Sequence, residues 1–272
     1  MSFQFLRMAI KQLIDNIMNP EKEIISRFIK PAFNRLADIK SIKTKNGQSL
    51  IVKNSFPILW FGDLDKYLNS KLKILTLGLN PSNIEFENKS RFDFQNSLNP
   101  NDTDFYTYIN ALNEYFKKNP YRTWFDNFNY LLKVFDTSYG FNDDNESNTA
   151  IHIDAISPFA TTQKISNLTA SDLATIEANY DVKELISFLK PDIILASINR
   201  TAFEKAFGTP SLIKNASIDG DNRYKYIRLY KGGENFFVIN GSCRNVPFGN
   251  IRNEVATKQI KVIFDEIKNQ VL

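Results

Sequence analysis

The sequence predicts an α/β protein of three layers, α/β/α, around a central, mostly parallel sheet of four to five strands. Short apolar runs typical of buried strands alternate with helical segments, which favours parallel strands covered by helices on both faces. The runs are KILTLGL at 73–79, AIHIDAI at 150–156, DIILAS at 192–197 and FFVING at 236–241. A hairpin-like stretch, RYKYIRLYKGGENFFVI, adds one antiparallel strand ahead of the last run.

The chain divides into an N-terminal extension over residues 1–55 and an α/β domain over residues 56–272. Apolar residues recur every three or four positions from Phe3 to Ile17, which predicts an amphipathic helix. A second helix is expected over Glu21–Asp38, interrupted or kinked at Pro31, because proline has no backbone N–H to donate.

Alternating residues on either side of Asn46-Gly47 predict a β-hairpin between Ser41 and Lys53. Lysines gather on this hairpin, and they form either a solvated face or an electrostatic arm for DNA. These lysines are Lys40, Lys43, Lys45 and Lys53.

Helical segments are expected between the strands of the domain, and one polar, acidic loop at 136–149. The helices are expected over Phe105–Lys118, Thr123–Phe135, Thr169–Leu189, Ala202–Phe207 and Glu254–Val271.

Composition restricts the chemistry that this chain can perform. Of 272 residues, 43% are hydrophobic, and 23 Phe and 11 Tyr indicate a packed core rather than disorder. The single cysteine, Cys243, excludes an internal disulfide, and the single histidine, His152, excludes the usual zinc ligand sets. We therefore expect no metal and no cofactor, and chemistry that uses amides, carboxylates and water.

The sequence favours an ordinary cytoplasmic protein over a membrane-spanning or secreted one. The longest apolar runs are far shorter than a bilayer span, and the N-terminal helix carries charges without a small-residue cleavage site. The net charge of +4 is compatible with a nucleic-acid partner but does not by itself argue for one.

In open α/β sheets, ligands bind outside the carboxyl ends of the strands, so the segments that follow the strands are candidate sites. GLNPSNIEF at 78–86 follows the first strand, HIDAISPFATT at 152–162 spans the end of the second, and NGSCRNVPFGNIRNE at 240–254 follows the last. His152 and Asp154 are two residues apart, so their side chains share one face of the strand.

Gly-Leu-Asn-Pro at the end of a buried strand resembles the first motif of the uracil-DNA glycosylase superfamily, nearest to its mismatch-specific and single-strand-selective branches. The resemblance covers about residues 56–268, and NPYRTWFDNFNYLL at 119–132 also resembles uncharacterised bacterial members. It implies that fold and a monomeric, bacterial DNA glycosylase acting on single- or double-stranded DNA in the nucleoid.

The resemblance assigns roles to individual residues. Asn80 would orient the water that attacks the sugar, Phe92 would stack on the extruded base, and Asp154 would contact the pairing edge of that base. From their positions beside these residues, we also expect His152 to support Asp154, and Ser82 to donate to a phosphate or to the base. The alternatives are ordinary: a turn residue for Asn80, a core aromatic for Phe92, a helix cap for Asp154 and a core histidine for His152.

The segment 240–249 resembles a divergent form of the loop that this superfamily presses into the DNA minor groove, lacking its Pro and His. Arg244, Val246 or Phe248 would then fill the gap left by the flipped base. The DNA-contacting residues implied are Ser242, Arg244, Asn245, Val246 and Phe248, with Cys243 incidental.

Asp154 departs from the superfamily, which usually has Asn at this place. An ionised carboxylate only accepts hydrogen bonds, which suits the exocyclic amine of cytosine and repels the O4 of uracil. We therefore expect a monofunctional glycosylase for cytosine-type, plausibly modified bases. Hypermodified cytosines occur in some bacteriophage genomes, so antiphage defence is one expected role and base-excision repair is the other.

Other functions remain open at this point. A protonated Asp154 would accept uracil, which gives a uracil or mismatch glycosylase. The same fold could serve as a catalytically inactive DNA-binding module. A small-molecule hydrolase or transferase could hold phosphate in the 78–82 turn, but the chain has neither a P-loop nor a GxGxxG fingerprint.

Overall fold

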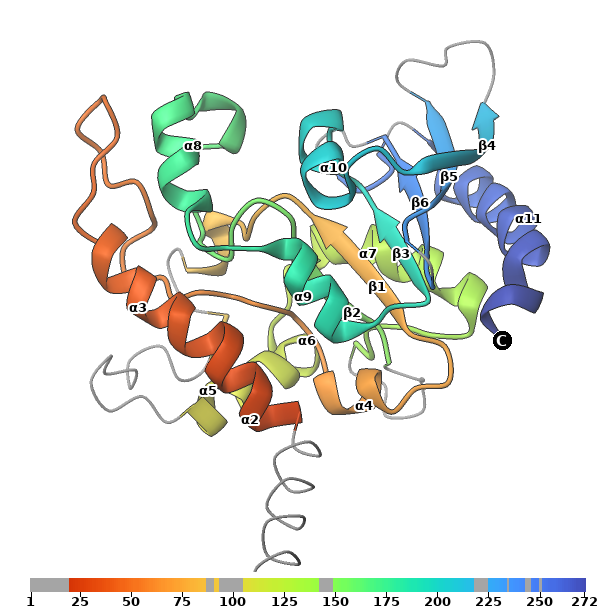
Figure 1. Cartoon of the computed structure of the whole chain (residues 1–272), viewed down its shortest axis with the longest axis horizontal. Coiled ribbons are helices and arrows are strands. Elements are labelled where there is room, and N and C mark those ends of the chain that lie inside the picture. Colours follow the sequence, from red (N-terminus) through yellow and green to blue (C-terminus); the bar gives the residue numbers. More distant parts are fainter. Residues whose placement is uncertain are drawn as a thin grey trace, which may run out of the picture.

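The structure is a computed structural model of the chain (Figure 1). Only part of the chain is described. The described residues are 20–86, 91–92, 105–141, 149–217, 225–233, 235–242, 246–249 and 251–272. The helix predicted between Phe3 and Ile17 lies outside them.

The described strands form one six-stranded sheet in the order β2-β1-β3-β6-β5-β4. Strands β2, β1, β3 and β6 are parallel to one another, whereas β5 is antiparallel to both of its neighbours, β6 and β4. The bounds are β1 Ile74–Gly78, β2 Ile151–Asp154, β3 Ile193–Ala196, β4 Ser211–Ser217, β5 Tyr226–Lys231 and β6 Phe237–Gly241. The predicted α/β class, the four buried parallel strands and the antiparallel strand before the last are confirmed.

The predicted count of four to five strands is wrong because β4 was not expected. Leu212 and Ile213 on this strand are 54% and 51% exposed, and the pairing with β5 is irregular between Leu212 and Lys214. An edge strand pairs on one side only, so its sequence need not show a buried apolar run.

The helix expected over Glu21–Asp38 is divided before its proline. It consists of α2 (Pro20–Ile24), a π-helical turn η1 (Ile25–Ile29) and α3 (Lys30–Ile39). Pro31 lies in the first turn of α3, where its missing N–H is tolerated, and the wider π turn lies just ahead of it. The predicted helix is present, and its irregularity is a π turn ahead of Pro31 rather than a break at Pro31.

The predicted hairpin is present in a short form. Lys43 and Ser49 make an antiparallel bridge, and Thr44 N donates to Gln48 O at 2.8 Å. Gly47 has φ +76°, the left-handed conformation that an Asn-Gly turn requires. The four lysines of this segment are exposed, as both of their predicted roles require.

Two predicted helices are each broken in two. Phe105–Lys118 is divided into α5 (Phe105–Asn113) and α6 (Tyr115–Lys118), and Thr169–Leu189 into α8 (Ala170–Glu177) and α9 (Val182–Leu189). Asn179 takes a left-handed φ of +62°, and Asp181 then caps α9 by accepting from Lys183 N and Glu184 N. The prediction of one continuous helix over Thr169–Leu189 was wrong. Both halves have an apolar face, which hides the boundary in the sequence, and local capping separates them into two helices.

The remaining helices agree with the predictions or are short additions. They are α4 (Leu64–Leu68), η2 (Asn83–Glu85), α7 (Arg122–Leu132), η3 (Lys133–Phe135), η4 (Ile165–Asn167), α10 (Arg200–Phe207) and α11 (Asn253–Val271). Within the part of the chain described here, no helix has both the length and the apolar content that crossing a bilayer demands.

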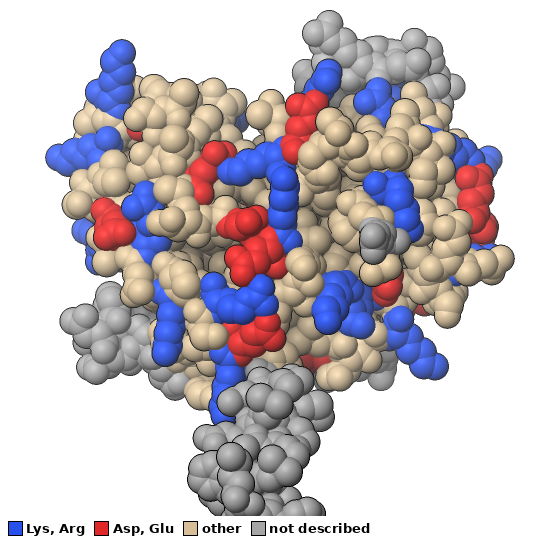
Figure 2. All heavy atoms as spheres, viewed as in Figure 1, with Lys and Arg blue, Asp and Glu red and all other residues tan. Residues whose placement is uncertain are grey.

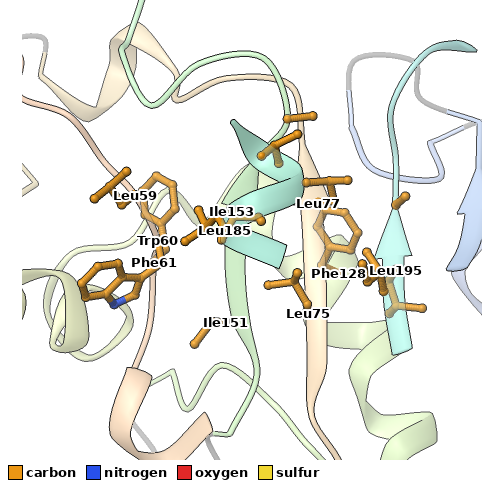
Figure 3. Close-up of a cluster of buried hydrophobic side chains, with 14 of the residues drawn as sticks. Leu59, Trp60, Phe61, Leu75, Leu77, Phe128, Ile151, Ile153, Leu185 and Leu195 are labelled. Carbon is orange, nitrogen blue, oxygen red and sulfur yellow. The ribbon is translucent and has the colours of Figure 1, made fainter. Parts of the chain in front are cut away.

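The two faces of the sheet differ in chemistry. Leu75 and Leu77 lie on one face, where Ile153 and Leu185 of α9 join them in the apolar core (Figure 3). The opposite face of β1 and β2 carries Thr76, Gly78, His152 and Asp154, because side chains alternate along a strand. This polar set lies under α7, whose Phe125 and Phe128 rings are 5.1 and 5.6 Å from the His152 ring.

An irregular segment, residues 55–62, is buried along the open side of β2. Phe61 N donates to His152 O at 2.8 Å, and His152 N donates to Phe61 O at 2.9 Å. These bonds satisfy the outer side of β2 and hold the His152 backbone in place.

Candidate functional site

The carboxyl ends of the four parallel strands meet at one edge of the sheet. Gly78 of β1 is in register with Asp154 of β2, and Ala196 of β3 with Asn240 of β6. This edge faces the side on which α8 and α10 lie (Figure 1), and Figure 2 shows a shallow notch in the outline between those two parts. The segments predicted to hold the functional residues come from three parts of the sequence. They lie along this one edge of the sheet, as the rule for strand ends predicts.

A chain of buried polar groups supports Asp154. Thr76 Oγ1 hydrogen-bonds both the Tyr139 hydroxyl and His152 Nδ1, the latter at 2.8 Å. His152 Nε2 then lies 3.5 Å from Asp154 Oδ1, and these two side chains are 2% and 3% exposed. Tyr180 donates to the backbone oxygen of Asp154 at 2.6 Å. His152 therefore lies beside the Asp154 carboxyl, as the supporting role predicted for it requires.

Sequence analysis missed Thr76 and Tyr139. A threonine in the apolar run KILTLGL was the available signal for Thr76, since it shares a strand face with Gly78. Tyr139 lay in the predicted 136–149 loop, and nothing local marks it among 11 tyrosines.

Because Gly78 has no side chain, there is room beside it for the Asp154 carboxyl. A Cβ atom at position 78 would lie 2.6 Å from Asp154 Oδ1 and 2.9 Å from His152 Nε2. Both distances are shorter than real Cβ contacts, so a side chain here must displace the polar pair.

We predict that Gly78→Ala lowers the free energy of unfolding by about 1–3 kcal/mol, the usual cost of overpacking, and displaces Asp154. Urea unfolding of Gly78→Ala, Asp154→Ala and the double variant measures the coupling of the two positions. The double variant should be more stable than the sum of the single effects predicts, because it has no Asp154 oxygen to clash. Strict additivity would contradict this steric account.

Glu85 is a buried acid that sequence analysis did not single out. It ends the short helix η2 and is 1% exposed; the Tyr115 hydroxyl donates to its Oε2 at 2.7 Å. Burial, helped by the negative charge of Asp154, raises the pKa of Glu85 to about 8, although Tyr115 and Arg91 act in the opposite direction. Its residue type alone is equally typical of an exposed helix end.

Asn80 is half-buried just beyond β1. Its carboxamide nitrogen donates to Pro81 O at 3.0 Å and to Thr161 Oγ1 at 3.2 Å. Both donors of the side chain are thus engaged, and the oxygen is the group that can accept a further hydrogen bond. Ser82, two residues on, caps η2 by accepting from Ile84 N at 3.2 Å, the ordinary alternative to a ligand contact.

Phe92 lies inside an aromatic cluster and is 3% exposed. Its ring centroid is 5.0 Å from that of Phe56, 5.1 Å from Tyr115 and 6.1 Å from Phe86. In this position it is a core residue, and stacking on a base would require these neighbours to uncover one of its faces.

The last loop is anchored by Phe248. Its ring is buried over Gly241, where a Cβ atom would lie 2.1 Å from the ring, and its backbone N donates to Ser197 Oγ at 3.1 Å. Phe248 therefore faces the core here, and Val246 is half-buried. The predicted contacts Arg244 and Asn245, and also Cys243, lie outside the described residues.

Two buried oxygen atoms at the end of β6 have no hydrogen-bond partner among the described residues. They are Asn240 Oδ1 and Ser242 Oγ, in side chains that are 4% and 5% exposed. A buried oxygen atom without a hydrogen-bond partner costs free energy, so its presence calls for an explanation, such as a role in a functional site.

The surface beside the site carries charges of both signs. A hollow of about 620 Å³ between α3 and α9 is lined by Arg35, Tyr180, Lys183 and Glu184, among others. Figure 2 shows basic and acidic side chains intermingled across this face. A face of mixed charge is not the uniformly basic surface on which a DNA backbone is held.

No protein-family model and no curated protein matches the chain. Among the described residues, no three His, Cys, Asp or Glu side chains gather in a way that could hold a metal ion. The chemistry available at the sheet edge is that of an amide, two carboxyls, an imidazole and hydroxyls.

Proposed function

We propose that this protein is a monofunctional DNA glycosylase that flips a base out of DNA and hydrolyses its N-glycosidic bond. Breaking the bond sends its electron pair to the base; water then adds its hydroxyl to the sugar C1′ and supplies a proton to the base. The observation that carries the proposal is the Asn80 side chain, whose engaged nitrogen leaves its oxygen to orient that water.

A uracil-DNA glycosylase-like fold is part of the proposal. It is supported by the motifs that resemble that superfamily, together with the adjacency of their strands. Asn80 follows β1, Asp154 ends β2, and β1 and β2 are neighbours in the sheet. Residues 240–249, after β6, would contact DNA on the same edge.

Asp154 is the proposed reader of the base. As a carboxylate it accepts from the exocyclic amine of cytosine and repels the O4 of uracil, so the proposed substrate is a cytosine-type, plausibly modified base. The role of such an enzyme would be antiphage defence or base-excision repair.

The test is base release from oligonucleotides that contain one uracil, one cytosine or one 5-hydroxymethylcytosine, both single- and double-stranded. Alkaline cleavage then reveals abasic sites, and mass spectrometry of DNA digests identifies the base released. We expect release of a cytosine-type base. Binding of all oligonucleotides without any abasic site would instead indicate an inactive DNA-binding module.

That second function is favoured by one observation, the burial of Phe92 and Asp154, each 3% exposed. A base would need these side chains to be uncovered before it could stack and pair. The inactive module predicts DNA affinity that is the same with Asn80 or with Ala at position 80.

We predict that Asp154→Asn changes base preference from cytosine-type bases towards uracil, because an amide supplies both a donor and an acceptor. The change in the ratio of release rates should be about tenfold to a hundredfold, corresponding to about 1–3 kcal/mol of discrimination per good base contact. Competition assays on mixed oligonucleotides measure it. An unchanged preference would refute Asp154 as the base reader.

A further inference from the structure

Glu85 has no role in the function proposed above, yet it is buried at the candidate site. Tyr115 of α6 and the side chain of Arg91 lie against it, and Asp154 of β2 is close enough for its charge to affect the pKa of Glu85. Among the described residues, Tyr115 is the one side chain that donates a hydrogen bond to it, to Oε2 at 2.7 Å. A buried carboxylate with a single direct donor is poorly compensated.

Arg91 forms a long ion pair with Glu85 but makes no hydrogen bond to it. Its Nε lies 3.9 Å from Glu85 Oε2, too far for a hydrogen bond, and that nitrogen is buried without a partner among the described residues. Its Nη1 instead donates to the backbone oxygens of Asn119 and Pro120 at 3.0 and 3.1 Å. The guanidinium is therefore held by the chain after α6, within ion-pair distance of Glu85 but not hydrogen-bonded to it.

Burial favours the protonated form of Glu85 near neutral pH, against the opposing effects of the Tyr115 hydrogen bond and the Arg91 charge. Burial and the charge of Asp154 raise its pKa from 4.5 to about 8. Burial also raises the pKa of Tyr115 well above its usual 10.0, so this neighbour stays neutral over the same range. The site thus holds two carboxyl groups, of which Glu85 ionises as the pH rises through about 8.

We infer that the protonation state of Glu85 controls base departure at this site. Neutral Glu85 permits departure of the base beside Asp154, and ionised Glu85 prevents it. The inference rests on the proposed glycosylase function. A base that leaves takes the electron pair of the broken C1′–N bond with it, so negative charge develops there. A second carboxylate in the same low-dielectric region opposes that charge, whereas a neutral carboxylic acid does not.

The first test is the pH dependence of base release. The rate of the unmodified protein should fall about tenfold for each pH unit well above about 8, as a single ionisation requires. Glu85→Gln, which resembles the protonated acid, should lack this alkaline fall. Glu114→Gln makes the same change at an exposed position on the neighbouring turn and should retain it. An alkaline fall that persists in Glu85→Gln overturns the inference.

A second variant gives a directional test. Tyr115→Phe removes the hydroxyl that stabilises ionised Glu85, so the alkaline fall should move to higher pH. A residue with only a structural role would not shift the profile in this direction. A fall that stays in place or moves to lower pH contradicts the proposal.

Infrared difference spectroscopy tests protonation without any activity. At neutral pH, unmodified protein minus Glu85→Gln should show the carbonyl band of a protonated carboxylic acid, which disappears as pH rises through about 8. If the band is absent, the neutral acid is refuted whether or not the protein is an enzyme. If the band is present but no base is released at any pH, the glycosylase function fails, and with it the role of Glu85 in base departure.

Discussion

Replacement of Asn80 by alanine is expected to reduce base release by about 10²–10⁴-fold, the usual contribution of a group that positions or activates the reacting water. The side chain is held by Pro81 O and Thr161 Oγ1 through its nitrogen, so the oxygen has a defined direction. Alanine removes that oxygen and leaves the backbone turn unchanged. Single-turnover release from the preferred oligonucleotide measures the loss.

Two controls make this result interpretable. Asn83→Ala makes the same chemical change three residues further along, and we expect it to change the rate by less than about threefold, as for a residue outside the reaction. Thr161→Val removes the hydroxyl that holds the Asn80 nitrogen and should cause an intermediate loss. A fully active Asn80→Ala protein would refute the proposed mechanism.

Replacement of Trp60 by alanine should lower the free energy of unfolding by about 3–5 kcal/mol, the range measured when a large buried aromatic is truncated. Trp60 is 0% exposed, and its indole N–H donates to Asn113 Oδ1 at 3.1 Å. Alanine therefore leaves a cavity and removes one of the two donors to Asn113, the other being Leu64 N. Since small domains are stable by about 5–15 kcal/mol, this is a large fraction of the total.

Urea unfolding measures this effect, and two variants separate its causes. Trp60→Phe keeps much of the volume and loses the hydrogen bond, so it should cost markedly less than alanine. Tyr130→Ala removes an aromatic ring that is 41% exposed and should change the free energy of unfolding by less than about 0.5 kcal/mol. Equal effects at positions 60 and 130 would contradict the packing described.

Much of the fold could be predicted because its signals are local. The four apolar runs became β1, β2, β3 and β6, since a strand buried on both faces must be apolar along its length. The spacing of His152 and Asp154 predicted a shared face, and both lie under α7 on that face. The missed strand β4 and the broken 169–189 helix depended on pairing at an edge and on the left-handed Asn179.

The candidate site was predicted in part. Asn80 and Asp154 were expected at strand ends, and their strands are neighbours in the sheet. Phe92 was expected as a stacking surface but lies among Phe56, Phe86 and Tyr115, where 3% of it is exposed. One aromatic residue among 23 Phe carries no local mark of whether it lines a pocket or fills the core.

By itself, the sequence determined the fold class, the positions of the parallel strands and the residue types available for chemistry, because periodicity and composition act within short stretches of chain. Only the tertiary structure decided the environment of each group. Thr76, His152 and Tyr139 come from three separate segments and form hydrogen bonds in the folded chain. Glu85 is shielded from solvent by the fold, and its pKa is affected by Arg91 and Asp154. Desolvation and charge depend on distance in space, which the order of residues along the chain does not contain.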